Sequence, residues 1–335
     1  MKRITMLVGV LVLTAGMLFA AGAAEDSGEG QRYIIVNNMA SWSHFDPDYE
    51  GARLAAQELT ELTGEEVTVE IVGPAENDLL AQAEAMDQAI ARNPDGFLVV
   101  AWDPNVVQSP INKAMAQGIP VITIDADSPE SDRIAYIGTD WRTLGEELGA
   151  ALAEEIDYEG KVAMLGLVGA DNMERAFDGF RSVMAQYEEV EIVALEHDEG
   201  QETKAAEVTR ALLQRHPDMA GFAGFDAGSG PGIATALRET GNVGTVKAVA
   251  NDMNTATLQA LEEGAIQFIL GQKRKFFGYW GVMLMYIHNR TGLTFTEDDA
   301  AAGIINVPPR IITGFLRANP ENLDLYWDLF GGYAE

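Results

Sequence analysis

Short apolar runs alternate with amphipathic segments along most of this chain. Runs rich in Ile and Val occur at 32–37, 67–72, 96–101 and 119–125. The stretches between them carry Leu and Ala at helical spacing, and two of these stretches stop at Gly64 and Gly118. Unbroken apolar runs of this length are typical of strands buried on both faces. Their alternation with helices predicts βαβ units and a parallel sheet.

The same pattern returns in the second half of the chain. Strands are expected at 162–168, 190–196, 219–225, 245–250 and 265–271, with helices between them. A chain of 335 residues is longer than a domain with a single hydrophobic core usually is. No long linker rich in Pro, Gly or Ser separates the halves. We therefore predict an α/β protein of two doubly wound, Rossmann-like domains joined by short hinge crossings.

The first residues follow a different pattern. Lys2 and Arg3 precede an uncharged apolar run at 4–20, and the sequence AGA follows at 21–23. These are the three parts of a secretory signal peptide, so residues 1–23 are expected to be a cleaved leader and the mature protein to be periplasmic. An uncleaved membrane anchor is the alternative, because the apolar run is long for a leader.

Charge and cysteine content remove several classes of function. The chain has 52 acidic and 22 basic side chains, a formal net charge of −30, and no cysteine. So acidic a protein is poorly suited to nucleic acids or anionic membrane surfaces, which attract basic residues. The lack of cysteine excludes disulfides, Cys-ligated metals and a lipid anchor through a lipobox. The four histidines form no i, i+4 pair, so we expect no metal site and no cofactor.

Polar and aromatic side chains follow nearly every predicted strand, where open α/β sheets bind their ligands. Aromatic rings can cover the apolar face of a sugar, while carboxylates, amides and a guanidinium bond its hydroxyls. Each Asp has the alternative role of a helix N-cap, and each Trp that of a core residue. The candidate ligand-binding residues are Trp42, His44, Phe45, Trp102, Asp125, Asp127, Asp171, Asn172, Arg175, Asp226, Asp252 and Gln272.

Motifs of catalysis are not found. The glycine cluster AGSGPG at 227–232 does not fit the dinucleotide fingerprint, because Ile233 stands where the third Gly belongs. It does not fit a nucleophile elbow around Ser229 either, because Ala227 replaces the first Gly. We expect no catalytic residue and no enzyme. An exported carbohydrate-active enzyme that uses paired carboxylates remains the alternative.

Several stretches resemble periplasmic sugar-binding proteins of ABC importers, of the ribose/galactose type. This resemblance implies a type I periplasmic binding protein fold with three hinge crossings near 138–140, 271–274 and 304–307. One lobe would comprise 32–138 plus 273–305, and the other 139–272 plus 306–335. The stretches that carry the resemblance are GIPVITIDAD (118–127), RIAYIGTD (133–140), ADNMERAFDGF (170–180), FAGFDAGSGPGIATAL (222–237) and AVANDMNTATLQAL (248–261).

The resemblance also implies roles for the strand-end residues. The aromatic loop of the family maps to Trp42, His44 and Phe45, the Asp that ends VITID to Asp125, and the Arg of the ER…GF motif to Arg175, approached by Asp171 and Asn172. Asp226, Asp252 and Gln272 map to its later strand ends. The sequence departs from the family at Ala126, where Arg is usual, at Trp102, where a polar residue is common, and at Phe225, where Asn is usual. These departures leave the identity of the sugar open.

The expected function is capture of a sugar or polyol in a cleft that closes around it. By resemblance, the partners are the membrane subunits of an ABC permease, and the protein is a monomer. A sensory role, in which the loaded protein docks on a chemoreceptor, is an alternative. Since Arg175 is the only cation among many candidate carboxylates, an amine-bearing ligand or a bound cation is an alternative to a neutral sugar. Repulsion disfavours an acidic sugar.

Overall fold

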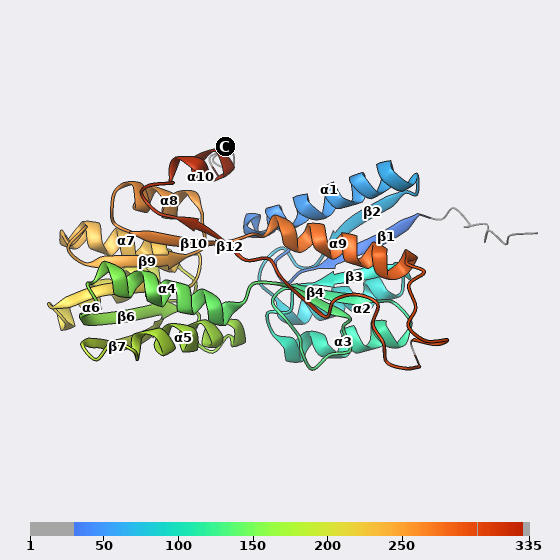
Figure 1. Cartoon of the computed structure of the whole chain (residues 1–335), viewed down its shortest axis with the longest axis horizontal. Coiled ribbons are helices and arrows are strands. Elements are labelled where there is room, and N and C mark those ends of the chain that lie inside the picture. The colour runs from blue at the N-terminus through green and yellow to red at the C-terminus, as the bar shows by residue number, and fades with distance from the viewer. Residues whose placement is uncertain (1–29, 300, 331–335) are drawn as a thin grey trace, which may run out of the picture.

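The computed structural model of the chain describes residues 30–299 and 301–330. Two lobes lie side by side, each built on one six-stranded sheet with helices on both faces (Figure 1). The strand orders are β11-β5-β4-β3-β1-β2 and β12-β10-β9-β8-β6-β7. The prediction of two doubly wound α/β domains is therefore confirmed. The expected signal peptide at 1–23 lies outside the described residues.

The first lobe contains a wholly parallel sheet. Its central strands β1, β3 and β4 are almost entirely buried, which explains why they read as unbroken apolar runs. The strands are β1 (Gln31–Val36), β2 (Val67–Val72), β3 (Gly96–Val99), β4 (Val121–Asp125), β5 (Ala135–Gly138) and β11 (Arg310–Ile312). The helices are η1 (Ser43–Phe45), α1 (Asp46–Thr63), α2 (Leu79–Ile90), α3 (Pro104–Ala116) and α9 (Lys275–Arg290).

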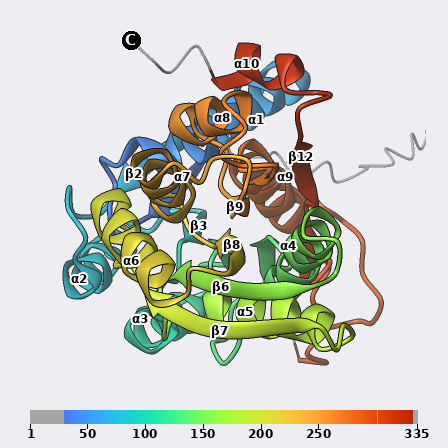
Figure 2. The same cartoon turned by 90° about the vertical axis from the view of Figure 1, so that its left-hand side faces the viewer.

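The second lobe repeats this plan, except that its edge strand β12 runs antiparallel to β10. Helices α6, α7 and α8 pack on one face of the sheet, and α4 and α5 on the other (Figure 2). The strands are β6 (Gly160–Gly166), β7 (Val190–His197), β8 (Met219–Gly224), β9 (Lys247–Asn251), β10 (Phe268–Gln272) and β12 (Phe315–Ala318). The helices are α4 (Trp141–Glu155), α5 (Asp171–Met184), α6 (Glu202–Arg215), α7 (Ser229–Thr240), α8 (Thr255–Glu262) and α10 (Asp324–Phe330).

The chain passes between the lobes after β5, after β10 and after β11. The third crossing was expected near 304–307, and that expectation was wrong. Ile311 pairs with Ile137 of β5, so β11 belongs to the first sheet. The chain enters the second sheet only after Gly314, whose φ of 71° makes the turn. Residues 306–312 therefore do not lie in the second lobe.

Close helix pairs hold the crossings in place. A Cβ on Gly278 of α9 would lie 1.8 Å from the Asp48 carbonyl oxygen, and one on Gly51 of α1 would lie 1.9 Å from the Lys275 carbonyl oxygen. The two backbones therefore touch through glycine, and α1 and α9 lie along each other in Figure 1. This contact fixes the start of α9, and with it the crossing at 273–274, against the first lobe.

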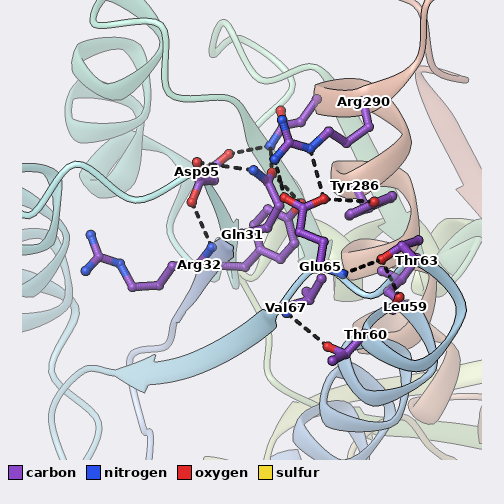
Figure 3. A network of polar contacts seen from close by, with 12 residues as sticks. Gln31, Arg32, Leu59, Thr60, Thr63, Glu65, Val67, Asp95, Tyr286 and Arg290 are labelled. Atoms are coloured by element: carbon purple, nitrogen blue, oxygen red, sulfur yellow. Dashed lines mark hydrogen bonds and ion pairs between the residues drawn. The ribbon is translucent and has the colours of Figure 1, made fainter. Parts of the chain in front are cut away.

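The other end of α9 is tied to the first lobe by polar contacts. Glu65 forms an ion pair with Arg290 and accepts a hydrogen bond of 3.0 Å from the Tyr286 hydroxyl (Figure 3). Asn289 donates to Gln31 Oε1 at the start of β1 over 2.8 Å. The helix is thus anchored at both ends, so the hinge segment before it starts from a rigid support.

No helix within 30–299 and 301–330 combines the length and the hydropathy needed to cross a bilayer.

Candidate ligand site at the strand ends

The carboxyl ends of the two sheets meet at the hinge. Gln272, the last residue of β10, donates through Nε2 to Thr139 Oγ1 over 2.8 Å, and Thr139 directly follows β5 of the other sheet. Asp125 ends β4, and Asp252 directly follows β9. Burial raises the pKa of Asp252, and the negative charge of Asp125 in the first lobe raises it further. Ligands of open α/β sheets bind beyond the carboxyl ends of the strands, which we call the strand-end rule. Here these ends bring residues of both lobes into one group.

Two of these aspartates share an unusual backbone. Asp125 has a φ of 65° and Asp252 a φ of 69°, both in the left-handed region that non-glycine residues seldom adopt. Such a conformation costs of order 1–3 kcal/mol and is concentrated at functional sites. Each turns the chain at the end of a strand, at the same position in its lobe. Strain at both positions points to a shared role for the two side chains.

Arg274 lies at the centre of this group. Its Nη2 donates to Asp48 Oδ2 over 2.6 Å, while Nη1 donates to Asp125 Oδ1 over 3.2 Å and to Gln272 Oε1 over 3.1 Å. The guanidinium also stacks over the Phe45 ring, 4.9 Å from its centroid. Arg274 is 7% exposed and Asp48 is fully buried. The structure therefore buries a three-way ion pair at the hinge.

Burial makes the acids of this group hard to ionise. It raises the pKa of Asp48 to about 7, against the opposing pull of Arg274. Burial likewise raises the pKa of Asp252 to about 7, again against Arg274. Near neutral pH, Asp48 and Asp252 can therefore each take up a proton, while Arg274 supplies a buried positive charge. No cluster of three or more His, Asp or Glu side chains in the described part of the chain is arranged to hold a metal ion.

Aromatic rings form the wall beside Asp125. Trp42 stacks on His44 with ring centroids 4.5 Å apart and meets Trp102 edge-on at 6.1 Å. The Trp102 indole Nε1 donates to Asp125 Oδ2 over 3.3 Å. Phe45 is fully buried beneath them, while the other three rings are half-buried. Desolvation, with the charge of Arg274, holds the pKa of His44 well below its usual range, so this ring is neutral.

Two of the candidate aspartates are engaged within their own lobes. Asp127 forms an ion pair with Arg133 and accepts a hydrogen bond from the Thr123 hydroxyl over 2.7 Å. Asp226 Oδ1 accepts the backbone N–H groups of Gly228 and Ser229, at 2.9 and 3.0 Å, at the start of α7. Asp226 thus stabilises the turn that leads into α7, whose N-cap residue is Gly228.

The remaining candidates lie on α5. Asp171 is its first residue, and Asn172 beside it is half-buried. Arg175 is exposed, one turn further along. The cation that the structure buries among the strand-end carboxylates is Arg274 instead. The sequence contains the signal, the basic run at 273–275 directly after a strand-end Gln, but it does not tell which of the three side chains turns inward.

The fold and this site define a class of two-lobed solute-binding proteins. A family model described as a periplasmic binding protein domain matches residues 33–291. The chain belongs to this family, whose members bind solutes and are not enzymes. The enzyme alternative is thereby set aside.

Three relatives illustrate the likeness. A sugar-binding protein of a sugar ABC transporter from Bacillus halodurans superposes with a TM-score of 0.82 at 29% identity, covering 88% of this chain and 100% of that one. The arabinose-binding protein AraP of Geobacillus stearothermophilus gives 0.79 at 26%, covering 89% and 99%. The xylose/arabinose-binding protein XylF of Sulfolobus acidocaldarius is 25% identical over 273 residues, which cover 77% of this chain and 66% of XylF.

Proposed function

We propose that this protein is the sugar-binding component of an ABC importer and captures a neutral monosaccharide between its lobes. The observation that carries the proposal is the position of Asp125. Trp102 and Arg274 hold its two oxygens, aromatic rings stand beside it, and its charge adds to the burial that raises the pKa of Asp252 in the other lobe. A sugar needs an aromatic ring to cover its apolar face and carboxylates to accept hydrogen bonds from its hydroxyls.

The preferred ligand class is a neutral aldopentose. The relative AraP is an arabinose-binding protein and XylF is a xylose/arabinose-binding protein, which supports this class. The charge of the site supports a neutral ligand, because Arg274 already pairs with Asp48 and Asp125, and burial raises the pKa of Asp252 to about 7 so that it can be protonated. An amine-bearing ligand needs an ionised carboxylate as its partner. Asp48 already pairs with Arg274, and the raised pKa of Asp252 makes its carboxylate harder to ionise.

Capture proceeds by closure about the hinge. Asp125 and Trp102 come from the first lobe and Asp252 from the second, so a ligand held by both stabilises the closed arrangement over the open one. The three short crossings limit the motion to bending of the lobes about their junction. The closed, loaded protein is the form that the permease subunits recognise, after export directed by residues 1–23.

A thermal-shift screen followed by calorimetry tests the proposal. The panel contains arabinose, xylose, ribose, galactose and xylitol, with glucosamine as the amine and galacturonate as the acid. A ligand at about a thousand times its Kd stabilises the folded state by about 4 kcal/mol, which is a clear rise in Tm. We expect this for a neutral sugar, with one site and no turnover. Stabilisation by glucosamine alone, or by none of these compounds, would contradict the proposal.

A pair of variants checks that binding occurs at the strand ends. Asp125→Ala removes the carboxylate between Trp102 and Arg274 and should abolish the thermal shift. Asp132→Ala removes an exposed carboxylate from a loop of the same lobe and should leave the shift unchanged. Equal shifts in the two variants would place the ligand elsewhere.

A further inference from the structure

One nitrogen of Arg274 contacts two strand-end side chains that belong to different sheets. Nη1 donates to Asp125 Oδ1, from β4, and to Gln272 Oε1, from β10. Because Arg has donors only, its contact fixes which end of the Gln272 amide is oxygen. The Gln272 nitrogen then donates to Thr139. The relative position of the two side chains therefore depends on where the guanidinium sits.

Asp48 determines that position. It is fully buried on α1, its Oδ2 accepts the shortest of the three hydrogen bonds, and its Oδ1 has no hydrogen-bond partner within the described residues. A buried ion pair is a weak source of stability, because desolvation offsets the attraction, and apolar residues of similar volume often serve as well. Stability alone therefore gives little reason for this pair in the core of the first lobe.

We propose that Arg274, anchored by Asp48, is a positioning residue that holds Asp125 and Gln272 in the geometry that receives the sugar. This inference rests on the proposed function. Asp125 Oδ1 meets Arg274 and Oδ2 meets Trp102, so each oxygen keeps a lone pair for a ligand hydroxyl. Gln272 keeps one N–H. The ligand thus meets two acceptors and one donor whose directions are set before it arrives, which lowers the entropy lost on binding.

The test replaces the pair without leaving a charge unpaired at Asp48. In the double variant Asp48→Leu/Arg274→Met, we expect the Kd for the sugar found in the screen to rise about ten- to a hundredfold, the range for a lost hydrogen bond to a charged group. Circular dichroism should show the same fold. The control is Arg290→Met, which removes an ion pair at the far end of α9 and should change the Kd less than about twofold.

A second variant separates positioning from charge. Arg274→Lys keeps the positive charge but lacks the planar fork that can bond Asp48 and Asp125 at once. We expect it to bind the sugar clearly more weakly than the wild type. A Kd equal to that of the wild type, in this variant or in the double variant, would overturn the proposal.

A readout without sugar distinguishes failure of this inference from failure of the proposed function. The Trp102 indole N–H bonds Asp125, so its ¹⁵N–¹H resonance, assigned with Trp102→Phe, reports where that carboxylate lies. The resonance should move in the double variant and stay in Arg290→Met. An unmoved resonance overturns the positioning role even if sugar binds. A moved resonance with no sugar bound by the wild type keeps the positioning of Asp125 and rejects the sugar.

Discussion

The buried carboxyl of Asp48 makes stability depend on pH in a direction opposite to that of most acids. An unfolded Asp releases its proton near pH 3.8, while folded Asp48 does so near 7 because burial disfavours the charge. Between these values the folded state holds the additional proton. The stability from this group is therefore full below about pH 4 and is lost as the pH rises through about 7.

Asp48→Asn removes this titration while keeping the shape of the side chain. From low to high pH, the raised pKa of Asp48 removes about 4 kcal/mol from the free energy of unfolding. About 2–3 kcal/mol of this loss falls between pH 5 and pH 8. We therefore expect the free energy of unfolding of the variant, relative to the wild type, to rise by that amount between these two pH values. The large negative charge of the chain affects both proteins alike and cancels in the comparison.

Urea unfolding followed by circular dichroism at pH 5, 6, 7 and 8 measures this difference. Asp46→Asn is the matched control, because Asp46 is an exposed acid at the start of the same helix. Its pH profile should run parallel to that of the wild type. If the profile of Asp48→Asn also runs parallel, within about 0.5 kcal/mol, Asp48 is not buried as an acid that titrates near neutrality and the reasoning fails.

Three further outcomes follow from the packing and the site. Calorimetry should show at least about a tenfold loss of sugar affinity in Asp252→Asn and in Trp102→Ala, and an unchanged Kd would remove that residue from the site. Gly278→Val should lower the free energy of unfolding by more than about 2 kcal/mol, since its Cβ would meet the backbone of α1, whereas Gly292→Ala, in open space, should change it by less than about 0.5 kcal/mol. Asn289→Ala should cost about 1–2 kcal/mol in urea unfolding without altering sugar affinity.

The sequence predicts the layers of this fold well because each central strand is buried on both faces. Such strands must be apolar without interruption, and the helices between them must be amphipathic, so both periods are visible in the chain. The third crossing was misplaced for the converse reason. β11 has three residues, none of them buried, and carries no such pattern. Its place in the first sheet follows from pairing with β5, which is a tertiary contact.

The same limit applies to the site. The strand-end rule gives the place of a side chain but not its direction, which depends on local backbone angles and nearby partners. Asp125 and Asp252 turn into the group through a left-handed φ. Asp127, two residues beyond Asp125, meets Arg133 instead, and Asp226 accepts the backbone N–H groups of Gly228 and Ser229 in the turn before α7. No periodic pattern distinguishes these four aspartates.

Arg274 also accounts for one departure from the family pattern. Ribose binders resembling this chain usually carry Arg directly after the aspartate that ends VITID, and here that position is Ala126, a buried residue too small to contact a ligand hydroxyl. The guanidinium beside Asp125 comes instead from the hinge crossing, on the other side of the carboxylate from Trp102. A cation directly before α9, which packs along α1, can be anchored by Asp48 of α1, whereas one at 126 would extend from the end of β4. Because Arg274 lies at the hinge, its guanidinium bonds both Asp125 and Gln272. It therefore links candidate ligand-binding side chains of the two sheets.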